Sequence, residues 1–271
     1  MMHVDVNKQI PDSVRQEIGR RLNKIEVDQG VKIIYACESG SRAWGFASMD
    51  SDYDVRFLYA RPQNWYLSVF EQRDVIEPGI DNAEVIYDLS GWDIKKAFAL
   101  LRNSNGPLIE WLNSPIVYQS ETTIEFIKAI QAEIFLPRNT VYHYRSMAKR
   151  LFKRLCLSEQ AKLKTYFYIL RASLCALYIK EENSIPPVLF SELYNRYLAG
   201  SPLGDKVTEL IELKSSQTEK DRIARVAELD DYIADTLESI GAAMPEHREK
   251  ADKAQFNRAF IETVNALDSK I

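Results

Sequence analysis

Apolar residues recur with the helical period near the N-terminus and then give way to short apolar runs. Val14, Ile18, Leu22 and Ile25 follow one another at spacings of three and four, which predicts an amphipathic helix that ends before Gly30. The next apolar runs are short and rich in β-branched and aromatic residues, as buried strands are. They predict strands over residues 31–37, 53–59, 74–76 and 84–89.

The helical period returns at Gly91 and continues toward the end of the chain. A first pattern spans 91–101 and a second spans 108–112, and no strand pattern follows residue 118. Further helical patterns cover residues 121–135, 139–157, 160–182, 188–199, 204–217, 221–242 and 254–268. We therefore expect an α+β protein of two domains, with an α/β domain at 1–120 and an all-helical domain at 121–271.

The composition is that of an ordinary globular protein. Of the 271 residues, 46% are apolar and 27% are charged, which excludes the collagen-like, disordered and coiled-coil classes. The three cysteines (Cys37, Cys156 and Cys175) are odd in number and widely spaced, so neither a disulfide framework nor a zinc finger is indicated. The first ten residues lack the features of a signal peptide, and the most apolar stretch, 166–179, is too short to cross a bilayer. We expect a soluble cytoplasmic protein that does not contact a membrane.

The charge is unevenly distributed along the chain. Lys and Arg number 35 against 39 Asp and Glu, but the segment 138–180 holds ten basic residues and Glu159 as its one acidic residue. A basic segment between more acidic ones is a candidate surface for polyphosphate or for an RNA backbone. The alternative for any single cation is a solvated position on a helix.

Two acidic residues stand at the start of the second predicted strand. Asp52 and Asp54 are two residues apart, and side chains at that spacing on a strand project from the same face. Carboxylates held so close repel each other unless a cation lies between them. Mg²⁺ meets that requirement, because it binds through one or two carboxylates together with substrate phosphates. The pair therefore predicts a metal site.

A glycine-serine turn precedes this pair. Gly40 and Ser41 combine a backbone that a phosphate can approach closely with N–H and hydroxyl donors. Asp88 is a third candidate, because it stands in the apolar run 85–89, where a lone carboxylate is costly to bury unless it is paired or bound to metal. Asp93 is an alternative to Asp88, although the dipole of the next helix would explain its charge.

At this point the sequence resembles a known family. Gly40-Ser41, ten residues and then Asp52-x-Asp54 match G-S-x10-D-x-D, the signature of nucleotidyltransferases of the DNA polymerase β superfamily. Residues 35–118 further resemble a bacterial and phage subgroup described as RNA-repair-associated polymerase-β-type proteins, and a looser likeness covers 164–171. The resemblance implies a mixed β-sheet flanked by helices.

The resemblance also implies a role for each candidate. Asp52 and Asp54 would bind two Mg²⁺ ions, with Mn²⁺ as a substitute, and Asp88 would hold the catalytic ion and help to deprotonate the acceptor. Gly40 and Ser41 would hold the β- and γ-phosphates of a nucleoside triphosphate. Two cations about 3.5–4 Å apart stabilise both the attacking and the leaving oxygen, so pyrophosphate would leave in line.

Three basic residues complete the predicted nucleotide-binding site. Arg42 follows the turn directly and could reach a phosphate. Lys164 and Arg171 would share one helix face with Tyr168, and from that face the two cations could clamp the triphosphate. The alternative for each of the three cations is an ordinary structural position, at the surface or at the rim of a core.

The sequence thus predicts a Mg²⁺-dependent nucleotidyltransferase that moves a nucleoside monophosphate from a triphosphate such as ATP to an acceptor hydroxyl. An RNA end would suit the basic segment 138–180, whereas a protein or a small molecule would suit the same catalytic frame. A rival class is a non-catalytic, antitoxin-like protein that keeps this fold to bind a partner. The catalytic interpretation requires the carboxylate oxygens to converge and not to be permanently paired with lysine or arginine.

Overall fold

Packing contacts group the chain into two compact units. The computed structural model describes residues 6, 10–48, 50–79, 85–216 and 222–268. One unit, here called the sheet unit, comprises 6–43, 52–134 and the segment from 249 onward, and the other, the helical unit, comprises 44–51 and 135–248. The units therefore differ from a division at one boundary near residue 120, because each is assembled from separate segments.

The sheet unit is built on five strands in the order β3-β4-β2-β1-β5. β2 runs parallel to β4, and the other neighbours are antiparallel, so the sheet is mixed, as the family resemblance implies. The strands are β1 (Lys32–Glu38), β2 (Tyr53–Ala60), β3 (Val75–Ile76), β4 (Tyr87–Asp93) and β5 (Val117–Ser120). The four strands that the apolar runs predict are present as β1 to β4, with shifted ends.

Helices complete the sheet unit and share one apolar core with the strands. They are α1 (Asp12–Gln29), α2 (Gly40–Trp44, of which Trp44 is grouped with the helical unit), α3 (Gln63–Tyr66), α4 (Ile94–Leu101), α5 (Gly106–Leu112), α6 (Thr123–Glu133) and α12 (Lys253–Asp268). Side chains from β1, β2, α4, α5 and α6 pack together, among them Ile34, Leu58, Phe98 and Ile124. Phe256 and its apolar neighbours on α12 join this core, which explains why the last helix belongs to the sheet unit.

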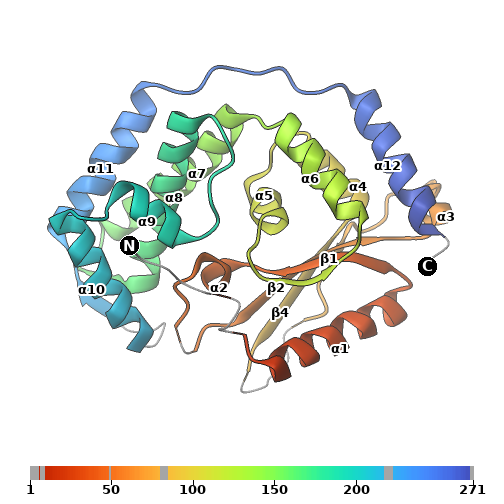
Figure 1. Ribbon diagram of the computed structural model, residues 1–271, viewed down its shortest axis with the longest axis horizontal. Helices are drawn as coiled ribbons and strands as arrows, with labels where there is room; N and C mark the ends of the chain where they lie inside the picture. Colours follow the sequence, from red (N-terminus) through yellow and green to blue (C-terminus); the bar gives the residue numbers. More distant parts are fainter. Residues whose placement is uncertain (1–5, 7–9, 49, 80–84, 217–221, 269–271) are drawn as a thin grey trace. The chain divides into compact units, whose positions relative to one another are not determined.

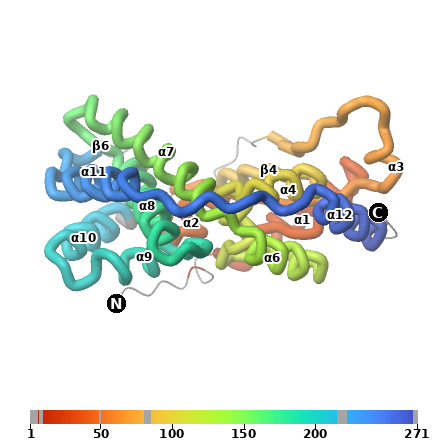
Figure 2. Tube along the Cα trace, turned by 90° about the horizontal axis from the view of Figure 1, so that it is seen from above, coloured from red at the N-terminus to blue at the C-terminus, as the bar shows by residue number. Residues whose placement is uncertain are grey.

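The helical unit is organised around one buried helix. α8 (Leu163–Glu182) is buried over most of its surface, and both α7 (Pro137–Leu155) and α11 (Ala227–Ala242) pack against it (Figures 1 and 2). The unit also contains α9 (Phe190–Tyr197) and α10 (Pro202–Ser216). The helices that the periodicity predicts in this region are confirmed, with their ends moved by a few residues.

Two short strands lie among these helices. β6 (Gln160–Lys162) pairs antiparallel with β7 (Arg222–Ala224). The sequence predicts helix over both segments. The strands were not predicted, because each is only three residues long and its partner lies about sixty residues away. Pairing at that separation leaves no trace in a local period.

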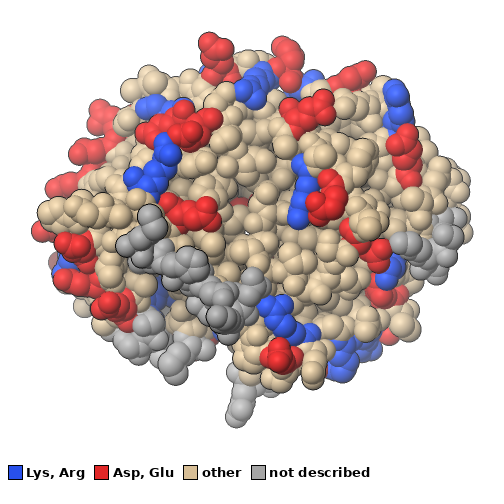
Figure 3. Space-filling model, in the orientation of Figure 1, with Lys and Arg blue, Asp and Glu red and all other residues tan. Residues whose placement is uncertain are grey.

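Two further features concern the surface charge and the apolar character of the helices. On the face drawn in Figure 3, acidic and basic side chains lie among one another and do not separate into two fields. Within the described residues, no helix combines the length and the apolar character needed to cross a bilayer.

A close approach between two strands explains where β4 lies. Gly91 is the register partner of the fully buried Phe57, and a Cβ atom on Gly91 would lie 2.0 Å from Cε2 of that ring. The Phe57 ring therefore needs a residue without a side chain opposite it on β4. β4 runs through Gly91 to Asp93, whereas the sequence predicts that this strand ends at residue 89.

We predict that Gly91→Ala lowers the free energy of unfolding by about 1–3 kcal/mol or more, because the added methyl group overpacks the space that the Phe57 ring fills. Urea denaturation measures the change. Gly19→Ala is the control, since Gly19 lies inside α1 with nothing within 4 Å of its Cβ position. That substitution should stabilise the protein by about 0.5–1 kcal/mol. Equal effects of the two substitutions would contradict the packing explanation.

Candidate active site

The parallel pairing of β2 with β4 places two of the predicted carboxylates side by side. Asp54 and Asp88 are register partners, so their side chains leave the sheet from the same face. On both strands this face is partly open to solvent at these positions, whereas Val55 and Leu89 on the other face are buried. Asp88 thus stands beside Asp54, as expected for a shared site.

The connection from β1 into α2 lies against Asp54. Gly40 has a left-handed backbone, with φ of 62°, and a Cβ atom there would lie 2.4 Å from Oδ2 of Asp54. The Ser39 N–H donates to the backbone oxygen of Asp54 at 2.9 Å, which fixes the turn against the start of β2. Ser41 is buried beside Gly40. The glycine is therefore required twice, by its conformation and by the closeness of a carboxylate.

A buried glutamate, which the sequence analysis did not identify, supports the same strand. Glu38 is fully buried at the end of β1, where Oε1 accepts from the Asp54 N–H at 2.8 Å and Oε2 accepts from the Tyr118 hydroxyl. Burial raises the pKa of Glu38 to about 7, although both hydrogen bonds favour its charged form. An acidic residue directly after the apolar run 33–37 was the signal that could have revealed it.

Asp52 and Arg42 lie just outside the strand pair. Asp52 precedes β2 and is exposed, and its backbone oxygen accepts from Nε of Arg42 at 3.1 Å. The guanidinium of Arg42 stacks 4.0 Å from the centre of the Tyr53 ring, and the side chain is buried. The Arg42 side chain therefore helps to hold the segment that carries Asp52.

An arginine connects Asp54 with Asp88. Nη2 of Arg56 donates to Oδ1 of Asp54 at 3.0 Å and to Oδ2 of Asp88 at 2.7 Å. Nη1 donates to the backbone oxygens of Asp88 at 2.8 Å and of Val55 at 3.2 Å. The carboxylate oxygens do converge, but they converge on a guanidinium. The pattern Asp54-x-Arg56, with both side chains on one strand face, was a signal that the sequence analysis did not use.

The carboxylates of Asp54 and Asp88 suit a magnesium ion, because Mg²⁺ prefers oxygen ligands and because their oxygens converge on one point. In the part of the chain that the structure describes, no group of three or more His, Cys, Asp or Glu side chains is arranged to hold a metal ion. Mg²⁺ needs only one or two protein carboxylates when phosphate oxygens supply other ligands. Asp54 and Asp88 offer such a pair, and a cationic nitrogen already lies between them.

The two cations predicted on α8 belong to the helical unit, and the carboxylates belong to the sheet unit. Nζ of Lys164 lies 5.8 Å from the centre of the Tyr168 ring. Arg171 is 1% exposed, donates from Nε and Nη2 to the backbone oxygen of Val188 at 3.1 Å, and packs on Trp44. The structure thus describes local contacts for both, and their role toward a nucleotide stays a prediction.

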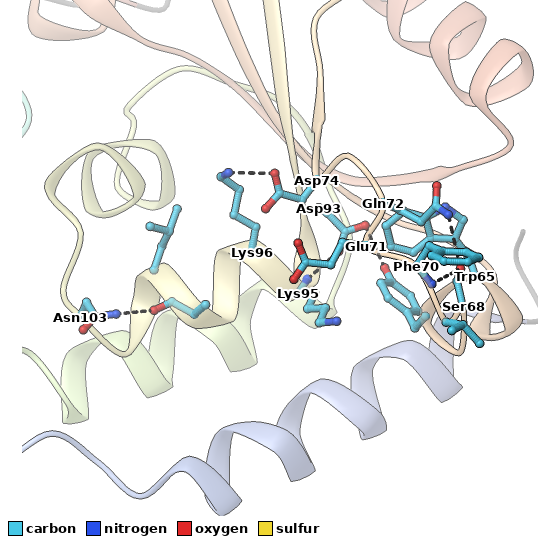
Figure 4. A pocket seen from close by; sticks show the side chains of 14 residues that line it. Trp65, Ser68, Phe70, Glu71, Gln72, Asp74, Asp93, Lys95, Lys96 and Asn103 are labelled. Atoms are coloured by element: carbon cyan, nitrogen blue, oxygen red, sulfur yellow. Dashed lines mark hydrogen bonds and ion pairs between the residues drawn. The ribbon is translucent and has the colours of Figure 1, made fainter.

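A pocket lies elsewhere in the sheet unit. It has a volume of about 520 Å³ and is lined by the segment 65–74 and by residues of α4 (Figure 4). Lys96 reaches across it to Asp74 at 2.9 Å. The pocket borders Asp93, at the opposite end of β4 from Asp88, so its size says nothing about the chemistry of the carboxylate pair.

Asp93, which lines this pocket, has a structural role at the start of α4. It caps α4 by accepting from the Lys95 N–H at 2.8 Å, and it accepts from the Tyr66 hydroxyl at 3.2 Å. Burial raises its pKa to about 6. Its register partner is Tyr59, which separates it along the strand from Asp54. Asp88 is therefore the better placed third carboxylate.

Comparisons with known proteins give one family and one curated relative. A family profile described as RlaP, RNA repair pathway DNA polymerase beta family, matches residues 14–262. An uncharacterized protein of Bacillus subtilis (strain 168), YcgL, is 42% identical over 257 residues, which cover 94% of this chain and 98% of the relative. A solved nucleotidyltransferase-like protein from Exiguobacterium sibiricum 255-15 is 13% identical, with a TM-score of 0.31 over 83% of this chain and 73% of that chain. A score this low carries no weight for fold or function.

We predict that Gly40→Ala destabilises the protein more than Gly30→Ala. Both glycines have a left-handed φ, 62° and 58°, so an alanine at either position is strained by about 1–2 kcal/mol. Only at Gly40 would the new methyl group also push against Asp54, whereas nothing lies within 4 Å at Gly30. Urea denaturation of both variants should show an additional loss of about 1–3 kcal/mol for Gly40→Ala. Similar losses would mean that the close approach to Asp54 is unimportant.

Proposed function

Because the chain belongs to the RNA repair pathway DNA polymerase beta family, we propose that it is a divalent-metal-dependent nucleotidyltransferase. It would join the nucleoside monophosphate of a triphosphate, such as ATP, to an acceptor hydroxyl and release pyrophosphate. The observation that carries this proposal is the register pairing of Asp54 with Asp88 next to the Gly40 turn. Two carboxylates beside a glycine that lets a phosphate approach the backbone are what such chemistry needs.

In this proposal, one group of residues binds the metal ions and another binds the nucleotide. Asp52, Asp54 and Asp88 would hold two Mg²⁺ ions, which neutralise the charge that develops on the attacking and leaving oxygens. Asp88 would also draw the proton from the acceptor hydroxyl. Gly40 and Ser41 would orient the β- and γ-phosphates through backbone N–H groups and a hydroxyl.

Arg42, Lys164 and Arg171 would neutralise the triphosphate in this proposal. Arg42 follows the turn directly in the chain, which supports a role near the phosphates. For Lys164 and Arg171 the support is the family resemblance of α8. The contacts that bury Arg171 favour a role in shaping the helical unit as well.

An RNA end is the acceptor that the charge distribution favours. Four cations on two successive turns of α7 (Lys149, Arg150, Lys153 and Arg154) are exposed and line a shallow groove of about 410 Å³. No ion pair joins any of them to an acidic residue among the residues with described positions. Phosphate groups are the natural counter-ions for such a stripe.

One observation favours the rival, non-catalytic class. The contacts of Arg56 with Asp54 and Asp88 neutralise the carboxylates that the reaction needs. A protein that keeps these carboxylates only as part of its sheet would bind a partner without turning over nucleotide. Direct assay separates the two classes.

We predict release of pyrophosphate when the protein is incubated with Mg²⁺ or Mn²⁺, labelled ATP or CTP, and total RNA, with the label appearing in RNA. Asp54→Asn and Asp88→Asn should each lower the rate by about a hundredfold or more, because each removes a proposed metal ligand. Asp28→Asn is the control, since Asp28 pairs with Lys24 on the exposed surface of α1. Failure of any nucleotide to bind, or full activity of Asp54→Asn, would refute the catalytic proposal.

We further predict that neutralising the stripe on α7 weakens RNA binding and its salt dependence. In Lys149→Gln with Lys153→Gln, the slope of log affinity against log salt should fall by about 1.4 for a single strand, since each phosphate contact contributes about 0.7. Fluorescence titrations at several salt concentrations measure this slope. Lys24→Gln with Lys206→Gln is the control, because both lysines are exposed and paired with acidic neighbours. An unchanged slope would point to a protein or small-molecule acceptor.

A further inference from the structure

The contacts of Arg56 set a constraint on metal binding that the family signature does not contain. Nη2 of Arg56 lies 3.0 Å from Oδ1 of Asp54 and 2.7 Å from Oδ2 of Asp88. A Mg²⁺ ion held by the same two oxygens would lie about 2.0–2.1 Å from each. The nitrogen and the ion would then compete for nearly the same point, and their like charges would repel each other.

The carboxylate pair needs a cation even without metal. Asp54 and Asp88 are side by side on neighbouring strands, and their side chains are 29% and 36% exposed, so water screens their repulsion only in part. Arg56 supplies that cation from the same strand face, two residues beyond Asp54. Hydrogen bonds from Nη1 to two backbone oxygens aim the guanidinium at the pair.

The Arg56 side chain is not fully enclosed by protein. Its side chain is 18% exposed, and it lies on the face of β2 that is partly open to solvent. A guanidinium in that position can move toward water, whereas a fully buried one could not without disturbing the core. The catalytic proposal therefore requires that a divalent cation can displace this contact.

We infer that Arg56 is an internal counter-ion that holds Asp54 and Asp88 together while no metal is bound and leaves their shared oxygens when a divalent cation binds. The inference rests on the proposed function, because it assigns the carboxylate pair to a metal. It adds that the protein's own cation sets the affinity for the metal, so that binding requires displacement of Arg56.

The test is Mn²⁺ binding to the full chain without nucleotide, followed by calorimetry or by the electron paramagnetic resonance of free Mn²⁺. Arg56→Met removes the competing charge, and a charge at this distance shifts binding of a small cation by about tenfold or more. We expect the Mn²⁺ dissociation constant of Arg56→Met to fall by about that factor. In chelator, its thermal midpoint should drop by roughly 2–6 °C, and saturating Mn²⁺ should restore it.

Two further variants keep the result interpretable. Arg73→Met removes a cation that pairs with Glu77 on the exposed surface of the same unit, and it should change neither the Mn²⁺ affinity nor the effect of Mn²⁺ on the midpoint. Arg56→Lys keeps the charge but lacks the second nitrogen with which Arg56 donates to the backbone oxygens of Asp88 and Val55, so its affinity should lie between those of the unchanged protein and Arg56→Met. Arg56→Lys also serves if Arg56→Met does not fold.

The outcomes separate the inference from the proposal beneath it. Equal or weaker Mn²⁺ binding by Arg56→Met and Arg56→Lys overturns the counter-ion role and leaves the proposed function standing. Absence of Mn²⁺ binding in every variant, with or without ATP, overturns both. Tighter binding with a destabilised, Mn²⁺-rescued apoprotein supports the inference.

Discussion

Repulsion between two carboxylates is the constraint on which the candidate site depends. Parallel pairing of β2 with β4 brings Asp54 and Asp88 into register, so their charges face each other across one strand spacing. Neither side chain can be moved to the other face without moving its whole strand by one residue, which would expose the buried neighbours Val55 and Leu89. The sheet therefore holds the two negative charges close together, and a cation is needed to neutralise them.

The surroundings of this pair are arranged to keep it in place. The carboxylate of Glu38 holds the backbone of Asp54 from the buried side, and Gly40 leaves room for Oδ2 of Asp54 on the other. Arg56 binds one oxygen of each aspartate. Buried or constrained charges of this kind are costly where they serve only stability. Their concentration at one edge of the sheet is typical of a functional site.

The sequence predicted the local features of the site because they depend on residues close together in the chain. The Gly40-Ser41 turn follows an apolar strand, and Asp54 stands near the start of the next, so the alternation of side chains was enough to place them. The choice of Asp88 over Asp93 followed from the helix that begins after Asp93, and the cap on α4 agrees with that reasoning. Arg56 and Glu38 were missed, since a guanidinium beside an aspartate and an acid at a strand end are unremarkable until their partners are known.

The chain by itself determined the mixed α+β class, four of the strands and the helices of the second half, whereas a short helix, α2, forms where the sequence predicts a glycine-serine turn. Only the tertiary structure decided their partners. The β6–β7 ladder, the packing of α12 into the core of the sheet unit and the grouping of 44–51 with the helical unit all join segments far apart in sequence. Local periodicity reports which face of an element is apolar but not which distant surface covers it. For the same reason the sequence could predict two carboxylates in need of a cation, and only the fold could show that the chain supplies one from its own strand.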